Sequence, residues 1–200
     1  MKKVISLILV VLLLMSSLPM TIFAEELNQP ILTIESADVS PGTSFDVNVT
    51  LKNNPGIVSA NLRLAFDEGL TLVGATNGAV FSTMSYTPPK QLETVGKITS
   101  GCQFAWFTSD ISDKDIKDGT IITLTFELTE EAEIGDTYSI AILGNEGDFV
   151  DKNLTPFALS AESNVTAVDY TPGDVNDDGN INMLDVVYIS RYIVEIFVIL

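Results

Sequence analysis

Histidine is absent from the 200 residues of this chain, and cysteine and tryptophan each occur once. Without histidine, the chain cannot build a Ser-His-Asp or Cys-His catalytic site, nor a zinc site with histidine ligands. A single cysteine also excludes an internal disulfide. That residue, Cys102, lies in the alternating run 98–107 on the same side as Phe104 and Trp106. We therefore expect a buried, unreactive thiol.

Basic side chains are scarce as well. The chain has ten Lys and Arg residues but 27 Asp and Glu residues, which gives it a formal net charge of −17. A chain of this charge is repelled by nucleic acid and by anionic membranes, so neither is an expected partner.

The longest apolar run, Val4 to Leu14, lies close to the N-terminus. It follows Met1-Lys2-Lys3 and is itself followed by Ile22-Phe23-Ala24. This order is typical of a secretory signal peptide, and the run is too short for a membrane span of about 20 residues. We predict a signal peptide over residues 1–24, cleaved after Ala24, and a secreted, extracellular protein. Cleavage would remove two lysines, leaving 8 basic against 27 acidic residues, or −19.

Residues 31–167 carry the two-residue period of half-buried β-strands. In 44–51, Val47, Val49 and Leu51 fall on one side. In 57–66, the inward side is predicted to hold Ala60, Leu62, Leu64 and Phe66. Turn residues such as Pro41-Gly42 and Asn53-Asn54-Pro55-Gly56 separate strands about every ten residues, which favours an all-β sandwich or jelly roll. The stretch 77–97 has no clear period.

A cluster of oxygen-bearing side chains follows at residues 174–185. They occupy the first, third, fifth, ninth and twelfth positions, and Gly179 occupies the sixth. This is the ligand order of a calcium loop of the EF-hand type, because a hard cation needs six to eight oxygen ligands and the loop needs a sharp turn at its sixth residue. A solvated Asx-rich turn is the alternative. The predicted calcium ligands are Asp174, Asn176, Asp178, Asn180 through its carbonyl, Asn182 and Asp185.

No helix leads into this loop, since Thr171-Pro172-Gly173 precedes it. The unit is therefore a loop followed by a helix, with Val186, Ile189 and Ile193 expected to face inward. With Asp185 in place of the usual Glu, residues 171–194 resemble the first half of a dockerin, the calcium module that plugs proteins into cellulosome scaffolds. The sequence then ends in the apolar run 195–200. We interpret this end as a truncated or frame-shifted second repeat, or as a hydrophobic plug against the sandwich.

The strand region resembles a second family. Asn53-Asn54-Pro55-Gly56-Ile57 runs into Asn61-Leu-Arg-Leu-Ala-Phe-Asp67, and Asp118-Gly119-Thr120 heads the run 121–126. These motifs, in this order, resemble a cohesin over nearly all of 31–167. The resemblance implies a jelly-roll β-sandwich of about nine strands that receives a dockerin on one sheet face. The expected domains are the signal peptide at 1–24, the sandwich at 25–168 and the partial dockerin at 169–200.

The cohesin resemblance also implies where partners bind. The docking strand is expected to be the outward side of 57–66, with a neighbouring strand at 98–107. The predicted partner-binding residues on the sandwich are Ser59, Asn61, Arg63, Gln103 and Ala105. On the dockerin-like helix they are Met183, Leu184, Val187 and Arg191.

Two other functions compete with docking. A polysaccharide hydrolase needs two facing carboxylates. The acidic groups in 110–115 and 130–133 sit in loop-like stretches and are expected to be solvated. A sugar-binding jelly roll would use exposed aromatic side chains, for which Tyr86, Trp106 and Phe107 are the candidates. The favoured hypothesis is a secreted, non-catalytic adaptor of a cellulosome-like complex. It would bind a dockerin-bearing enzyme and dock to a scaffold, supporting polysaccharide breakdown by assembly.

Overall fold

A computed structural model describes residues 29–112, 116–169, 173–176 and 181–198 of the chain. The predicted signal peptide lies outside these ranges, as do two of the predicted calcium ligands, Asp178 and Asn180. Contacts divide the chain into a first unit, 1–30, and a second, 31–200.

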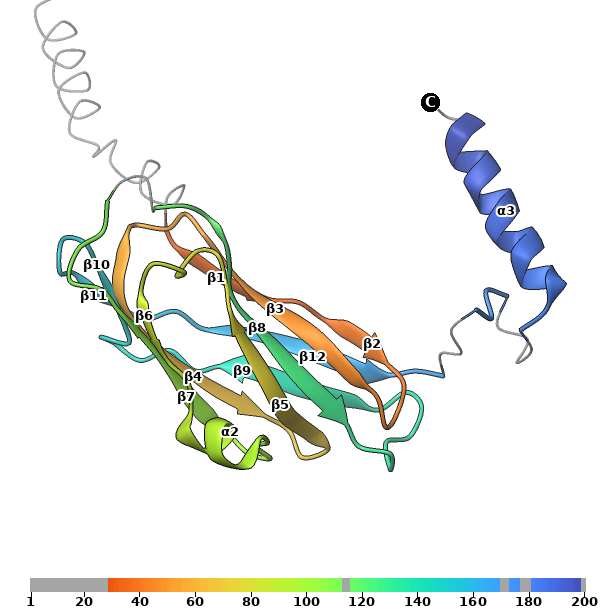
Figure 1. Cartoon of the computed structure of the whole chain (residues 1–200), viewed down its shortest axis with the longest axis horizontal. Helices are drawn as coiled ribbons and strands as arrows, with labels where there is room; N and C mark the ends of the chain where they lie inside the picture. The colour runs from red at the N-terminus through yellow and green to blue at the C-terminus, as the bar shows by residue number, and fades with distance from the viewer. Residues whose placement is uncertain (1–28, 113–115, 170–172, 177–180, 199–200) are drawn as a thin grey trace, which may run out of the picture. The chain divides into compact units, whose positions relative to one another are not determined.

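The described part of the second unit contains twelve strands in two sheets (Figure 1). The strands are β1 Ile31–Ile34, β2 Ala37–Val39, β3 Ser44–Lys52, β4 Ile57–Phe66, β5 Leu70–Asn77, β6 Ser85–Thr87, β7 Cys102–Phe107, β8 Gly119–Leu128, β9 Thr137–Ile142, β10 Phe149–Asp151, β11 Pro156–Phe157 and β12 Ala161–Ala167. One sheet has the order β1-β3-β8-β5. The other follows β11-β10-β4-β9-β12-β2, with β7 on β4 and β6 on β7. The predicted all-β jelly-roll sandwich is confirmed, with four very short strands added to the longer ones.

The core between the sheets comes from the alternating positions of the long strands. Val47, Val49 and Leu51 are fully buried, and Leu62 and Leu64 of β4 are buried opposite them in the second sheet. The predicted inward faces of these two strands are therefore confirmed. One predicted member, Phe66, is only half-buried at the end of β4. Its ring packs edge-on against Phe126, with the ring centroids 5.2 Å apart.

Trp106 lies in this core and is 1% exposed. Its indole Nε1 donates a hydrogen bond to Asn77 Oδ1 at 2.8 Å, which satisfies the one polar group that burial removes from water. Its ring packs against Phe81 and Tyr86, with centroids 5.5 and 5.4 Å apart. The inward direction of Trp106, predicted from alternation, is confirmed.

The stretch 77–97 is more regular than its sequence indicates. It contains β6, which pairs antiparallel with β7 through Tyr86 and Trp106, and the short helix α2 Lys90–Val95. Gly96 ends this helix in the left-handed conformation, with φ of 77°. Three strand residues and six helix residues are too few to display a period, so pairing with β7 sets this structure.

The C-terminal helix, α3 Met183–Val198, follows the predicted calcium loop. The inward face predicted for it was wrong: Val186, Ile189 and Ile193 are 52%, 43% and 48% exposed. Met183 and Tyr192, elsewhere on the helix, are exposed too. Apolar residues lie around the whole helix, and the described residues bury none of them. The spacing of three and four residues identified the helix but not which side is covered.

Candidate functional site

The outward side of β4 and its neighbour β7 forms one surface, which we call the β4–β7 face. On β4, Ser59, Asn61 and Arg63 alternate with buried core residues. Antiparallel pairing places Ala105 opposite Asn61 and Gln103 opposite Arg63. The structure thus brings together on one sheet face the five sandwich residues predicted to bind a partner.

A carboxylate that sequence reasoning missed organises this face. Asp148, in the loop before β10, is 5% exposed. Arg63 Nε donates to both of its carboxylate oxygens, at 3.2 and 3.1 Å, and Asn61 Nδ2 donates to Oδ1 at 3.3 Å. The backbone N–H of Asn145 donates to Oδ2 at 2.8 Å. Gln103 in turn donates its side-chain N–H to Asn61 Oδ1. The polar groups of the face are therefore held in fixed directions.

The environment of Asp148 favours its ionised form. Burial alone would raise its pKa, but the hydrogen bond and charge of Arg63 and the donors from Asn145 and Asn61 outweigh it. The net result is a pKa of Asp148 below the ordinary value for Asp. The face thus carries a charge-assisted cluster that stays intact at neutral pH.

The predicted calcium loop shows a closed geometry in its described part. Asp185, at the twelfth position, is 2% exposed. Its Oδ1 accepts the backbone N–H of Val175 at 2.8 Å, and its Oδ2 accepts that of Asn182 at 2.7 Å. Asn182 Oδ1 accepts the N–H of Leu184 at 2.7 Å, at the start of α3. One carboxylate therefore links the beginning of the loop to its end and to the helix.

The donor chemistry of this loop suits a hard cation. The backbone N–H of Asn182 is the largest cause lowering the pKa of Asp185, and N–H groups of Val175 and Asn176 add to it. Asp185 is therefore ionised, as a metal ligand must be. Each carboxylate oxygen has a second lone pair beside the one that accepts an N–H. Together with Asp174, Asn176 and Asn182, this is an all-oxygen set, which fits calcium and disfavours zinc or copper.

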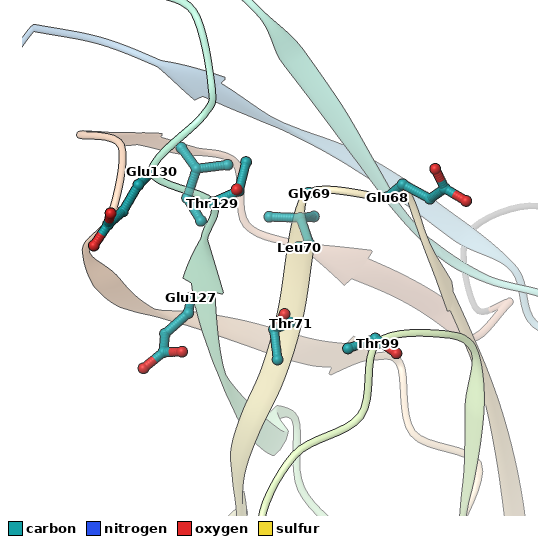
Figure 2. A pocket seen from close by; sticks show the side chains of 10 residues that line it. Glu68, Gly69, Leu70, Thr71, Thr99, Glu127, Thr129 and Glu130 are labelled. Carbon is teal, nitrogen blue, oxygen red and sulfur yellow. The ribbon is translucent and has the colours of Figure 1, made fainter.

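The sandwich also contains an acidic pocket of about 620 Å³, between the ends of β5 and β8. Its carboxylates belong to Glu68, Glu127 and Glu130. Figure 2 shows the Glu68 carboxylate pointing away from the other two. The Glu68 carboxylate therefore does not face either of the other two, as the paired carboxylates of a glycoside hydrolase would. Within the described ranges no group of three or more His, Cys, Asp or Glu side chains is placed to hold a metal ion, and Asp177 and Asp178 of the predicted calcium loop lie outside those ranges.

The aromatic residues considered for sugar binding do not form an exposed platform. Trp106 is buried in the core. Tyr86 is half-buried, and burial raises the pKa of its hydroxyl to about 12. Phe107 is exposed at 59%. Cys102 is half-buried rather than buried, and desolvation raises the pKa of its thiol to about 12, which keeps it protonated and unreactive.

None of the helices in the described ranges has both the length and the apolar character that crossing a bilayer requires.

Comparison with known proteins separates the chain into two regions. The family model described as "Cohesin domain" matches residues 31–166, and the model described as "Dockerin type I domain" matches residues 172–198. Both are non-catalytic interaction domains, and together they indicate protein–protein docking of the cellulosome type. The search of the curated proteins found no match.

Solved structures resemble the sandwich in fold. The sixth cohesin of scaffoldin B from Acetivibrio cellulolyticus, in complex with a Cel5 dockerin, is 20% identical, with a TM-score of 0.56 over 69% of this chain and 98% of that one. The Coh-OlpA–Doc918 complex of Clostridium thermocellum is 19% identical, with a TM-score of 0.52 over 70% of this chain and 100% of that one. A non-cellulosomal cohesin of Archaeoglobus fulgidus is 16% identical, with a TM-score of 0.56 over 75% of this chain and 99% of that one.

Proposed function

The chain belongs to the cohesin family, and we propose that it is a secreted, non-catalytic adaptor of a cellulosome-like complex. Its β4–β7 face receives a dockerin carried by an enzyme, and its C-terminal loop–helix unit docks to a cohesin on a scaffold. The observation that carries this proposal is the polar cluster around Asp148, which presents fixed hydrogen-bonding groups on an open sheet face. The adaptor supports polysaccharide breakdown by bringing an enzyme to its scaffold.

The β4–β7 face suits an incoming helix. Its central residues are short or firmly held, so a helix can lie across β4 and β7 without displacing long side chains. Asn61, Arg63 and Gln103 are already ordered by Asp148 and by one another. Binding therefore orders few additional side chains, which lowers the entropic cost of association.

Calcium is the proposed ion of the C-terminal unit, with the six ligands of loop 174–185 as its donors. When bound, the ion would neutralise the repulsion among the loop carboxylates. Asp185 contributes by connecting both ends of the loop, so that the loop and the first turn of α3 are ordered together. The proposed scaffold-facing residues, Met183, Leu184, Val187 and Arg191, are all exposed on the helix that this loop anchors.

The proposed division of the chain follows from these two functions. Residues 1–24 are the signal peptide, 25–168 the dockerin-receiving sandwich and 169–200 the dockerin-type unit. The family matches at 31–166 and 172–198 support the last two. N-terminal sequencing of the exported protein tests the first: export with a start at Glu25 is expected, and retention of Met1 would contradict it.

Calorimetric titration with a panel of purified type I dockerins tests the docking role, and the panel includes the Doc918 module. At least one module is expected to bind in one-to-one stoichiometry. Ser59→Arg should weaken that binding at least tenfold, because a long charged side chain would stand in the path of the helix. Ser44→Arg, the same change on the exposed side of β3 in the other sheet, is the control. The proposal fails if no module binds, or if both variants bind as the unchanged chain does.

A further inference from the structure

The β4–β7 face ends in an apolar hollow, which we call the Phe107 hollow. It measures about 310 Å³; Val58, Phe107, Ile111 and Leu154 form its apolar part, and Thr108, Ser109, Asp110 and Lys152 form a polar rim. Phe107 is 59% exposed and Leu154 is 77% exposed. The volume lies at the small end of the range for ligand pockets, about 300–1,000 Å³. Two large apolar side chains thus stand in water around a space that one further side chain can fill.

A β-bulge turns Val58 toward this hollow. Val150 of β10 pairs with Ser59, but the next residue, Asp151, pairs with Ile57, so Val58 has no partner on β10. Ile57 and Ala60 are buried, whereas the two residues between them are half-buried on the outward side. Such bulges redirect side chains and are frequent beside functional sites. Here the extra residue adds an apolar wall beside Phe107.

Leu154 is held in the hollow by a strained backbone. Its φ is 62°, a left-handed conformation that is unfavourable for a residue with a Cβ. Asp151 fixes this turn: its Oδ1 accepts the N–H groups of Asn153 and Thr155 at 2.8 and 2.9 Å. Its carbonyl accepts the N–H of Leu154 at 2.9 Å. Asn or Gly would suit this conformation better, and an exposed Leu adds no core packing in return.

The hollow is continuous with the β4–β7 face. Phe107 lies opposite Ser59 in the β4–β7 pairing, on the same outward side as Gln103 and Ala105. Thr108 N–H donates to the carbonyl of Val58 at 2.9 Å, which fixes the end of β7 against the bulge. A helix that crosses the polar cluster around Asp148 would therefore reach the hollow at its edge.

We propose that the Phe107 hollow is the apolar anchor site of the β4–β7 face, and that it takes one large apolar side chain from the helix of the partner dockerin. This inference rests on the proposed docking function and names the chemistry of the partner. Binding energy at protein interfaces concentrates where a large side chain fills a desolvated pocket beside polar contacts. Of the three aromatic side chains Tyr86, Trp106 and Phe107, only Phe107 is exposed, so a protein side chain fits the hollow better than a sugar that needs a broader aromatic platform.

Leu154→Asn is the decisive variant. Asn tolerates the left-handed conformation and removes the apolar group, so stability is expected to be unchanged or higher while binding falls. Phe107→Thr removes the second wall and keeps a residue suited to a strand. Ile134→Asn is the matched control: Ile134 is 61% exposed in the turn between β8 and β9, away from the face.

The experiment uses the full chain and a displayed library of type I dockerins with randomised helix positions, selected for binding to it. Selected binders are expected to share a Leu, Ile, Met or Phe at one helix position. Leu154→Asn and Phe107→Thr should each weaken the binding of these dockerins at least tenfold, and Ile134→Asn should leave it unchanged. Urea unfolding of each variant shows whether a loss of binding follows a loss of stability.

The outcomes separate the two proposals. If no library member binds the unchanged chain, the docking function fails and this inference fails with it. Binders that hold both hollow variants as tightly as the unchanged chain overturn this inference alone. A set of binders that share no apolar helix position would also overturn this inference alone. Binding of soluble cello-oligosaccharides that Leu154→Asn abolishes would make the hollow a sugar site and would also overturn it.

Discussion

Arg63 Nε lies 3.1 Å from one carboxylate oxygen of Asp148 and 3.2 Å from the other, although 85 residues separate the two in the sequence. The pair joins β4 to the loop before β10 across the surface of the sheet. Arg63 is 45% exposed and Asp148 only 5%, so the carboxylate is the buried anchor and the guanidinium reaches it from the solvent side. The cluster therefore supports both the fold and the proposed docking face.

Removing the anchor should destabilise the sandwich. Asp148→Ala leaves Arg63, Asn61 and the Asn145 N–H without their acceptor, so we expect the free energy of unfolding to fall by about 1–3 kcal/mol. Urea unfolding in excess calcium measures this change in the free energy of unfolding. Glu68→Ala, a change at an exposed carboxylate, should stay within about 0.5 kcal/mol. Equal stability of the two variants would show that the cluster contributes nothing to the fold.

The same carboxylate should make stability depend on pH. Because the pKa of Asp148 is lower in the folded than in the unfolded chain, where it is about 3.9, its contribution is fully present above that value. The contribution is lost as the pH falls through the folded pKa. The difference in unfolding free energy between the chain and Asp148→Asn should therefore shrink toward acid. A difference that stays constant from about pH 7 down to the acid limit of folding would contradict this assignment.

Calcium should order the C-terminal unit. Adding calcium to the chelated protein is expected to increase its helical circular dichroism, because neutralised loop carboxylates release the start of α3 from repulsion. Asp185→Ala should abolish the increase, since Asp185 connects both ends of the loop. Asp169→Ala, outside the loop, serves as the control and should keep it. An unchanged spectrum on adding calcium to the unmodified chain would refute the calcium site.

Strand faces were predictable because a two-residue period assigns each side chain to one side. Val47, Val49, Leu62 and Trp106 point inward as alternation predicts, and Ser59, Asn61 and Arg63 point outward for the same reason. The dockerin-type unit was likewise predictable, because its signal is the ligand spacing within twelve consecutive residues, and a dockerin family model matches there. Such local patterns need no knowledge of the rest of the fold.

Features that depend on distant pairing were not predictable. Nothing near Asp148 in the sequence indicates that Arg63 will reach it. The bulge at Val58 arises from the register of β10 on β4, which the sequence of β4 alone does not contain. For α3, apolar residues around the whole helix leave its covered side undefined. In each case the missing information lies in another segment of the chain.

The parallel pairing of β2 with β12 determines how the sandwich carries mechanical load. Ala37, Asp38 and Val39 pair in parallel with Val165, Thr166 and Ala167. Tension between the two ends of the chain enters through the start of the β1–β2 segment and leaves through the end of β12. Because the two strands run in the same direction, that tension pulls them past each other along their length and loads their hydrogen bonds together. A chain pulled at its two ends is thus strained in shear along β2 and β12 rather than peeled open bond by bond.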